Sequence, residues 1–237
     1  MTMNSVKQNK RNISIIYLIL FGLITVILWQ FQIGRLILYP FTILGTWFHE
    51  MAHGMTALVL GGSFIRLDIF SDGSGVAIHS GNLFFGNLGS ALTAGAGPMG
   101  PTIAGFIFLV SSTNRKFSRV LLFLLSIFML LSCLFWVRSW IGLGIIIFFS
   151  ILIFYTALKG SDRFQKLSLQ FLGVQAFASL YLSINYLFSS SAVINGQSYS
   201  SDTQVIAQNL LLPYWFWGGF ILSFSVVLIV ISIIKIK

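Results

Sequence analysis

Two histidines and a glutamate within five consecutive positions are the residues of this chain best suited to chemistry. They occur as His49-Glu50-Met51-Ala52-His53, and Glu50 is the only glutamate among the 237 residues. On a helix, residues four apart project from one face, so the two imidazoles can bind a single zinc ion. Glu50 is rotated away from that pair and can take the proton of an attacking water molecule. The pattern therefore predicts a catalytic zinc site with Glu50 as the base and His49 and His53 as ligands.

A catalytic zinc site of this kind needs a third protein ligand. Without a second glutamate, the candidates are His79, Asp68, Asp72, Asp162 and Asp202. Asp68 and Asp72 belong to a predicted hairpin, where Asp72 suits a turn because a glycine follows it. Asp162 lies between basic residues, as expected of a solvated loop charge. His79 ends the hairpin and could reach a nearby zinc, whereas Asp202 precedes a short helical run that it could cap or from which it could bind the metal.

The composition is that of a protein embedded in a membrane. Mean hydropathy is +0.92 and only 8% of the residues are charged, against roughly 25% in soluble domains. The net charge of +9 does not indicate a nucleic-acid-binding protein, because the basic residues lie between apolar segments, as topology determinants do. The single Cys133 excludes a disulfide framework and a cysteine-based metal site.

Apolar stretches long enough to span a bilayer recur along the whole chain. They lie at about 13–31, 36–60, 83–110, 119–137, 140–158, 167–188 and 210–234. We expect an all-α polytopic membrane protein with six or seven transmembrane helices, which forms one membrane-embedded domain over residues 1–237. The first stretch is too long for a signal peptide and is interpreted as an uncleaved span.

Three segments between or before these stretches differ from them in composition. Residues 63–80 combine β-branched and aromatic residues with a Ser-Asp-Gly-Ser-Gly turn cluster, which predicts a short β-hairpin. Residues 189–209 are rich in Ser, Asn and Gln and are expected to form a polar loop. Residues 1–12 carry three basic residues and are expected to be a cytoplasmic tail.

The distribution of positive charge suggests that one apolar stretch does not cross the membrane. If all seven stretches cross, the basic clusters near 115–119 and 159–166 fall outside, against the positive-inside rule. If 83–110 dips in and returns to the same side, both clusters fall inside. That segment is rich in glycine and proline, as broken elements packed against protein are. The charge count therefore favours six crossings plus one re-entrant segment over a plain seven-span arrangement.

Three sequence elements resemble one family of membrane enzymes. His49-Glu50-Met51-Ala52-His53-Gly54, the later Ala96-Gly97-Pro98-Met99-Gly100-Pro101 and the late Ser201-Asp202-Thr203 segment are similar to motifs of the site-2 proteases. These are intramembrane zinc metalloproteases, and the similarity is greatest to the minimal branch without PDZ or CBS domains. It covers about residues 40–230.

The resemblance implies a zinc endopeptidase of the cell membrane that hydrolyses membrane-spanning or membrane-associated protein substrates. Glu50 would be catalytic, and His49, His53 and Asp202 would bind the Zn²⁺. Two other functions are compatible with the same residues. A transporter could use the histidines and the Gly/Pro-rich segment as its pathway, and a catalytically silent relative could bind zinc and partner proteins.

Overall fold

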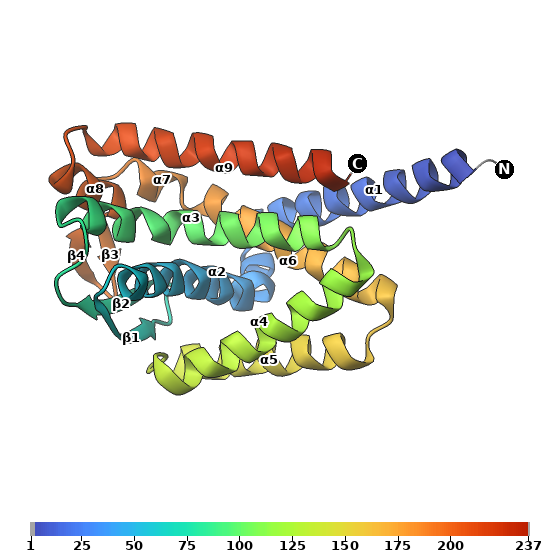
Figure 1. Ribbon diagram of the computed structural model, residues 1–237, viewed down its shortest axis with the longest axis horizontal. Helices are drawn as coiled ribbons and strands as arrows, with labels where there is room; N and C mark the ends of the chain where they lie inside the picture. The colour runs from blue at the N-terminus through green and yellow to red at the C-terminus, as the bar shows by residue number, and fades with distance from the viewer. Residues whose placement is uncertain (1–2, 237) are drawn as a thin grey trace.

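Long helices dominate the computed structural model, which describes the backbone of residues 3–236 and the side chains of residues 16–236 (Figure 1). The helices are α1 (Met3–Gln30), α2 (Gln32–Val59), α3 (Asn87–Ser111), α4 (Arg115–Phe135), α5 (Trp140–Lys159), α6 (Asp162–Leu182), α7 (Ile184–Leu187), α8 (Asp202–Asn209) and α9 (Tyr214–Ile236). The strands are β1 (Ser63–Ile69), β2 (Gly75–Ser80), β3 (Ser191–Ile194) and β4 (Gln197–Ser200). The basic side chains of the expected tail, 1–12, lie outside the described residues.

Several of these helices are long and apolar enough to cross a bilayer. Within the described residues, α3, α4, α5 and α9 meet that criterion separately. Residues 16–30 of α1 meet it together with α2, and a bend of 119° at Phe31 separates the two. The expectation of a mostly helical membrane protein with a small hairpin is confirmed, with four candidate spans, or five if the bent pair is one span.

Helix α3 is continuous, so the expectation of a broken element over 83–110 is wrong, while the re-entrant path of this segment stays a prediction. It runs for 25 residues, with Pro98 and Pro101 inside it, and at 1.5 Å per residue it is about 37 Å long. Its glycines allow neighbouring helices to approach closely. A Cβ atom on Gly105 would lie 3.1 Å from the carbonyl oxygen of Gly173 in α6, and one on Gly100 would lie 2.6 Å from the Cβ atom of Ala52 in α2. Small residues at membrane helix contacts serve this purpose.

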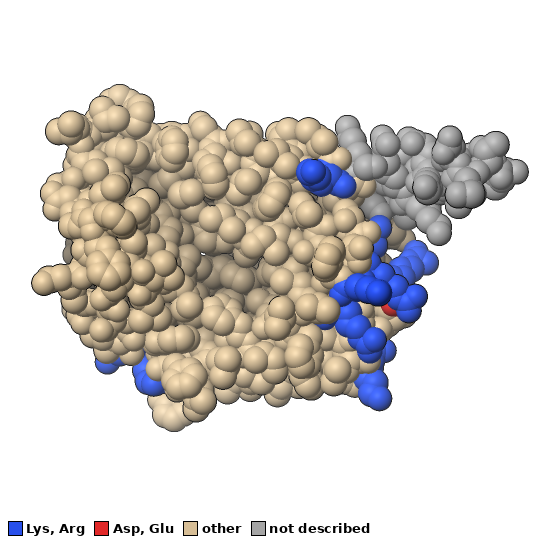
Figure 2. Space-filling model, in the orientation of Figure 1, with Lys and Arg blue, Asp and Glu red and all other residues tan. Residues whose placement is uncertain are grey.

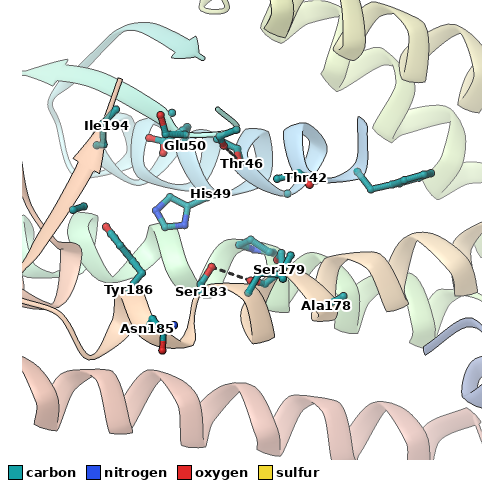
Figure 3. A pocket seen from close by; sticks show the side chains of 18 of the residues that line it. Thr42, Thr46, His49, Glu50, Ala178, Ser179, Ser183, Asn185, Tyr186 and Ile194 are labelled. Atoms are coloured by element: carbon teal, nitrogen blue, oxygen red, sulfur yellow. Dashed lines mark hydrogen bonds between the residues drawn. The ribbon is translucent and has the colours of Figure 1, made fainter. Parts of the chain in front are cut away.

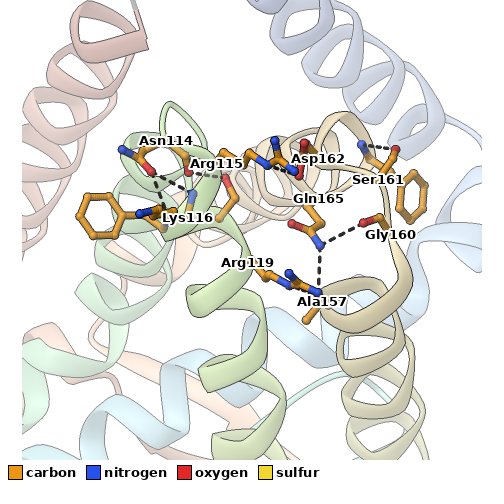
Figure 4. Close-up of polar contacts among 12 residues, drawn as sticks. Asn114, Arg115, Lys116, Arg119, Ala157, Gly160, Ser161, Asp162 and Gln165 are labelled. Atoms are coloured by element: carbon orange, nitrogen blue, oxygen red, sulfur yellow. Dashed lines mark hydrogen bonds and ion pairs between the residues drawn. The ribbon is translucent and has the colours of Figure 1, made fainter.

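Most of the Lys and Arg side chains visible in Figure 2 gather at one end of the molecule. Figure 1 places the α3–α4 and α5–α6 turns and the C-terminus at that end. The two turns are joined there by an ion pair between Arg115 Nε and Asp162 Oδ1, at 2.6 Å (Figure 4). Arg119 Nε also donates to the carbonyl oxygen of Ala157 near the end of α5, at 3.1 Å. The basic clusters on both sides of α4 and α5 therefore lie at the same end.

The first hairpin, β1–β2, has one covered edge and one open edge. On the edge away from β2, the N–H of Leu67 donates to Trp136 at 2.8 Å, and its carbonyl accepts from Arg138 at 2.9 Å. Leu67 pairs with Ala77, so the backbone groups of Ala77 point away from β1 in the alternation of an antiparallel ladder. Within the described chain no strand pairs with this outer edge of β2.

The segment 189–209, expected to be a polar loop, contains a second hairpin and a helix. Strands β3 and β4 are joined by Asn195-Gly196, both with positive φ (48° and 75°). This is the geometry of the two-residue hairpin turn that Asn-Gly favours. Helix α8 follows directly. The loop expectation failed because it considered polarity and ignored this turn signal.

The core fixes the rotation of α2, the helix that carries the histidines. Trp47 is fully buried and packs with β1, α4 and α5 in one apolar cluster. Its indole N–H donates to the hydroxyl of Ser132 in α4 at 2.9 Å. Because the Trp47 side of α2 faces this core, the side that carries His49 is turned toward the opposite part of the molecule.

Candidate metal centre

Three potential ligands from two distant parts of the chain meet at one point. His49 Nε2 lies 2.9 Å from Asp202 Oδ2, and His53 Nε2 lies 3.3 Å from Asp202 Oδ1. The candidate ligand atoms of all three lie within 4.8 Å of one another. The distances of 2.9 and 3.3 Å from Asp202 to the two histidines match those between atoms bound to one zinc ion at about 2.0–2.2 Å.

The ring of His53 is held with one nitrogen free for a metal. Its Nδ1 lies 2.7 Å from the carbonyl oxygen of Thr93 in α3, and since a carbonyl only accepts, Nδ1 is the donor. Nε2 then carries the free lone pair, as in metal sites where a backbone carbonyl orients a histidine. Gly97, one turn further along α3, faces both rings. A Cβ atom there would overlap Nε2 of His53 and lie 2.7 Å from Nε2 of His49.

Asp202 lies in the first turn of α8 and is not its cap. The hydroxyl of Ser201 accepts from the N–H of Gln204 at 3.2 Å, which makes Ser201 the N-cap. The N–H of Asp202 donates to the hydroxyl oxygen of Tyr186 at 3.0 Å. The carboxylate of Asp202 is thus free to face the histidines.

The other aspartates considered as ligands have partners elsewhere. Asp68 forms an ion pair with Arg66 at 2.9 Å, and Asp162 is in the ion pair at the basic end. Asp72 accepts from the hydroxyl and the N–H of Ser74, at 2.6 and 2.9 Å. These hydrogen bonds hold the pKa of Asp72 below its ordinary value. The expectation of a turn former at Asp72 agrees with this geometry.

His79 does not join the candidate ligands. It lies near the end of β2 opposite Phe64, with an exposed side chain. The group of residues close enough to share one metal contains His49, His53 and Asp202, and His79 is outside it. Among the candidates from sequence, the structure brings Asp202 to the histidines.

Glu50 lies between the histidine-bearing face of α2 and the open edge of β2. Glu50 is 7% exposed, and the backbone N–H of Ala77 in β2 is near its carboxylate. A Cβ atom on Gly75 would come within 2.9 Å of Glu50 Cγ, so the strand passes close above the glutamate. The base expected from sequence is therefore next to both the ligands and an unpaired strand edge.

A cavity of about 500 Å³ opens beside these residues. His49 and Glu50 project into it from α2, and Tyr186 and Ser183 approach from the opposite side (Figure 3). Its other lining residues include Thr42, Thr46, Ser179, Asn185 and Ile194. Hydroxyl and amide groups thus line a space among apolar helices that is large enough for several water molecules.

The donor set fits a zinc ion. Asp202 Oδ2 is buried and has no hydrogen-bond partner among the described residues, although it lies within ion-pair distance of His49. A buried carboxylate oxygen without a donor needs a cation. Two imidazole nitrogens and one carboxylate oxygen are ligands that zinc accepts, and the cavity supplies an open side.

Residues 12–232 match the family model described as Peptidase M50B-like. The chain belongs to the peptidase M50B-like family. This confirms its membership of the site-2 proteases. Neither the curated proteins nor the solved structures contain a match.

Three residues of this M50B-like site were not identified from sequence as parts of it. Tyr186 orients Asp202, the Thr93 carbonyl orients His53, and Gly97 leaves room for both imidazoles. The Ala-Gly-Pro element did mark the position of Gly97, but its role depends on how α3 packs against α2. The roles of Tyr186 and Thr93 could not be predicted from sequence, because the residues around them in the chain form no motif that distinguishes them from other tyrosines and backbone carbonyls.

Proposed function

We propose that this M50B-like peptidase is an intramembrane zinc endopeptidase, in which Glu50 is the general base and His49, His53 and Asp202 bind the zinc. The observation that carries the proposal is the meeting of Asp202 with the two histidines beside a buried glutamate. Charged and metal-binding side chains are expensive among apolar helices and are kept there for function. The coarser conclusion, a membrane peptidase, follows from the family itself.

Zinc in such a site polarises a carbonyl and acidifies a water molecule. Glu50 accepts the proton of the attacking water on a carboxylate oxygen and passes it to the leaving amide nitrogen. The Ala77 N–H is near that carboxylate, and the Thr93 carbonyl holds His53 in the tautomer whose Nε2 is free for a metal. Glu50 is largely buried and lines the cavity through which the attacking water can reach it.

The substrate we propose is a membrane-spanning or membrane-associated protein of the cell membrane. A transmembrane helix hides its amides in its own hydrogen bonds, so a segment must be unwound before hydrolysis. The outer edge of β2 offers the carbonyl of Ala77 and the backbone of Gly75 next to Glu50. An unwound segment can pair with this edge by strand addition.

The basic end supports a membrane orientation with six crossings. If the bent α1–α2 pair crosses once and α3, α4, α5, α6 and α9 cross once each, both termini and both basic clusters lie in the cytoplasm. The irregular crossing is then α1–α2, and α3 crosses fully. In a Cys133→Ser background, single cysteines at Asn82 and Thr113 should react with an impermeant maleimide from opposite sides. Labelling from one side would restore the re-entrant segment.

The decisive experiment compares metal content and peptide-bond cleavage in matched variants. Wild type should purify with about one zinc and cleave at least one of a panel of single-span reporter proteins. Glu50→Gln should keep the zinc and lose cleavage by orders of magnitude, whereas Asp202→Ala should lose both. Asp68→Asn is the control, since Asp68 pairs with Arg66 away from the site.

Two results would contradict the proposal in different ways. Wild-type protein without zinc, or Asp202→Ala with full zinc, would remove the metal site as assigned. Zinc-loaded wild type that cleaves no reporter, or Glu50→Gln that cleaves as wild type does, would favour the silent or transporter alternatives.

A further inference from the structure

The β3–β4 hairpin borders the candidate catalytic cavity with one of its edges. All four residues of β3 line the cavity, and none of the residues of β4 does. Successive side chains of a strand point to opposite faces of the sheet. Because every residue of β3 lines the cavity, β3 turns its edge toward the cavity and not one of its faces. Figure 3 shows Ile194, at the end of β3, on the Glu50 side of the cavity.

The hydrogen-bond pattern shows which backbone groups this edge offers. Ile194 and Gln197 flank a two-residue turn and form a hydrogen-bonded pair, so the next pair, Val193 with Ser198, is a non-hydrogen-bonded one. The N–H and C=O of Val193 therefore point away from β4. Two residues earlier, Ser191 follows the same alternation, and its outward groups bond to the side chain of Ser189.

The outward groups of Val193 have no partner within the described residues. Backbone groups that line a water-filled cavity can bond to water, which an occupant with its own donor and acceptor can replace. Lipid acyl chains supply neither, whereas an extended peptide supplies both. The half-buried Ala192 and Ile194 add aliphatic surface on the same strand.

The turn of the β3–β4 hairpin is hydrogen-bonded to the turn of the β1–β2 hairpin. The N–H of Asn195 donates to the hydroxyl oxygen of Ser74 at 3.3 Å, and that hydroxyl donates to Asp72 at 2.6 Å. Ser74 directly precedes β2. The two hairpins thus meet at their tips, and the cavity lined by β3 is also lined by Gly75, at the start of β2, and by Glu50 of α2.

We propose that the free edge of β3 is a peptide-binding subsite, which pairs with the unwound substrate segment through the backbone of Val193. The substrate is then held between two strand edges rather than by β2 alone. This inference rests on the proposed function, because the occupant is the peptide that is hydrolysed. The preferred segment is extended and aliphatic.

Two hydroxamates test the subsite without knowledge of the natural substrate. Acetohydroxamate carries a zinc-binding group alone, and a pentapeptide hydroxamate of aliphatic residues adds an extended chain of about 17 Å. Their Kd values are measured by calorimetry on the full-length protein in detergent. Val193→Pro removes the outward N–H without touching a ladder hydrogen bond. Ser198→Pro makes the same change on the outer edge of β4, and Val193→Ala keeps the backbone group.

Val193→Pro should weaken the pentapeptide hydroxamate roughly tenfold, as expected for a lost hydrogen bond, and leave acetohydroxamate unchanged. Ser198→Pro and Val193→Ala should bind both compounds as wild type does. Unchanged peptide binding by Val193→Pro would overturn the subsite, as would equal weakening by Ser198→Pro or by Val193→Ala. If Val193→Pro loses its zinc and Ser198→Pro keeps it, the role of β3 is to hold Asp202 in place. That result would also overturn the subsite.

The same experiment separates this inference from the proposed function. If wild type contains no zinc and binds neither hydroxamate, the metal centre itself is wrong. Suppose instead that acetohydroxamate binds, and that Val193→Pro binds the pentapeptide hydroxamate as tightly as wild type does. The metal centre is then supported and the subsite is wrong.

Discussion

Alanine in place of Gly97 should abolish zinc binding while the protein still folds. A Cβ atom at this position would overlap Nε2 of His53 and lie 2.7 Å from Nε2 of His49. The second distance is 0.7 Å inside the 3.4 Å at which ordinary van der Waals contact begins. Zinc sites tolerate ligand displacements of about 0.2 Å. The imidazoles would have to move further than this to make room for the methyl group, and they could then no longer bind the metal.

The expected loss of zinc affinity is larger than the roughly 10–100-fold that changes around the ligands cost. The helix itself should not suffer, because alanine is favoured over glycine inside a helix by roughly 0.5–1 kcal/mol. Gly95→Ala is the matched control on the same helix. Its added Cβ atom would meet only Ile206 Cδ1, at an ordinary 3.5 Å.

The assay is a competition titration of purified protein against a chromophoric zinc chelator, with size-exclusion profile and melting temperature recorded for each variant. Gly97→Ala should lose zinc at an unchanged elution volume, and Gly95→Ala should match wild type. Wild-type zinc affinity in Gly97→Ala would refute the assigned site. Equal loss in both variants would show that α3 packing, and not the histidines, is responsible.

Two further predictions concern the residues that hold the site in place. Tyr186→Phe removes the acceptor for the Asp202 N–H, so zinc affinity in the chelator titration should fall roughly 10–100-fold; unchanged affinity would mean that α8 holds Asp202 without it. Ser132→Ala leaves the buried indole N–H of Trp47 without its acceptor, which should cost about 1–3 kcal/mol of unfolding free energy. Denaturant titration in detergent measures this, and an unchanged midpoint would show that Trp47 finds another partner.

Short-range features of the site were predictable because they depend on local geometry. His49, Glu50 and His53 share one turn of one helix, so their spacing alone fixes which faces they occupy. The hairpin over 63–80 was predicted by its β-branched residues and its turn cluster, and apolar composition indicated the membrane. The second hairpin carried the equally local signal Asn195-Gly196, and only the emphasis on its polar composition concealed it.

Tertiary structure places Asp202, and not His79, beside the two histidines. Both residues satisfied the chemistry of a third ligand, and sequence spacing could not rank them. Ser201 caps α8 and leaves the Asp202 carboxylate free, while β2 leaves His79 exposed. Such an outcome depends on how α8 packs against α2 and α3, contacts between residues far apart in the chain.

The expectation of a broken element over 83–110 was also wrong for a long-range reason. Positive charge suggested that one apolar stretch does not cross the membrane fully, and glycine and proline content assigned this behaviour to 83–110. In the folded protein those glycines bring α3 close to α2 and α6, and the sharp bend lies at Phe31. A glycine in sequence permits a break and a close contact equally well, and only the neighbouring helices decide which of the two it serves.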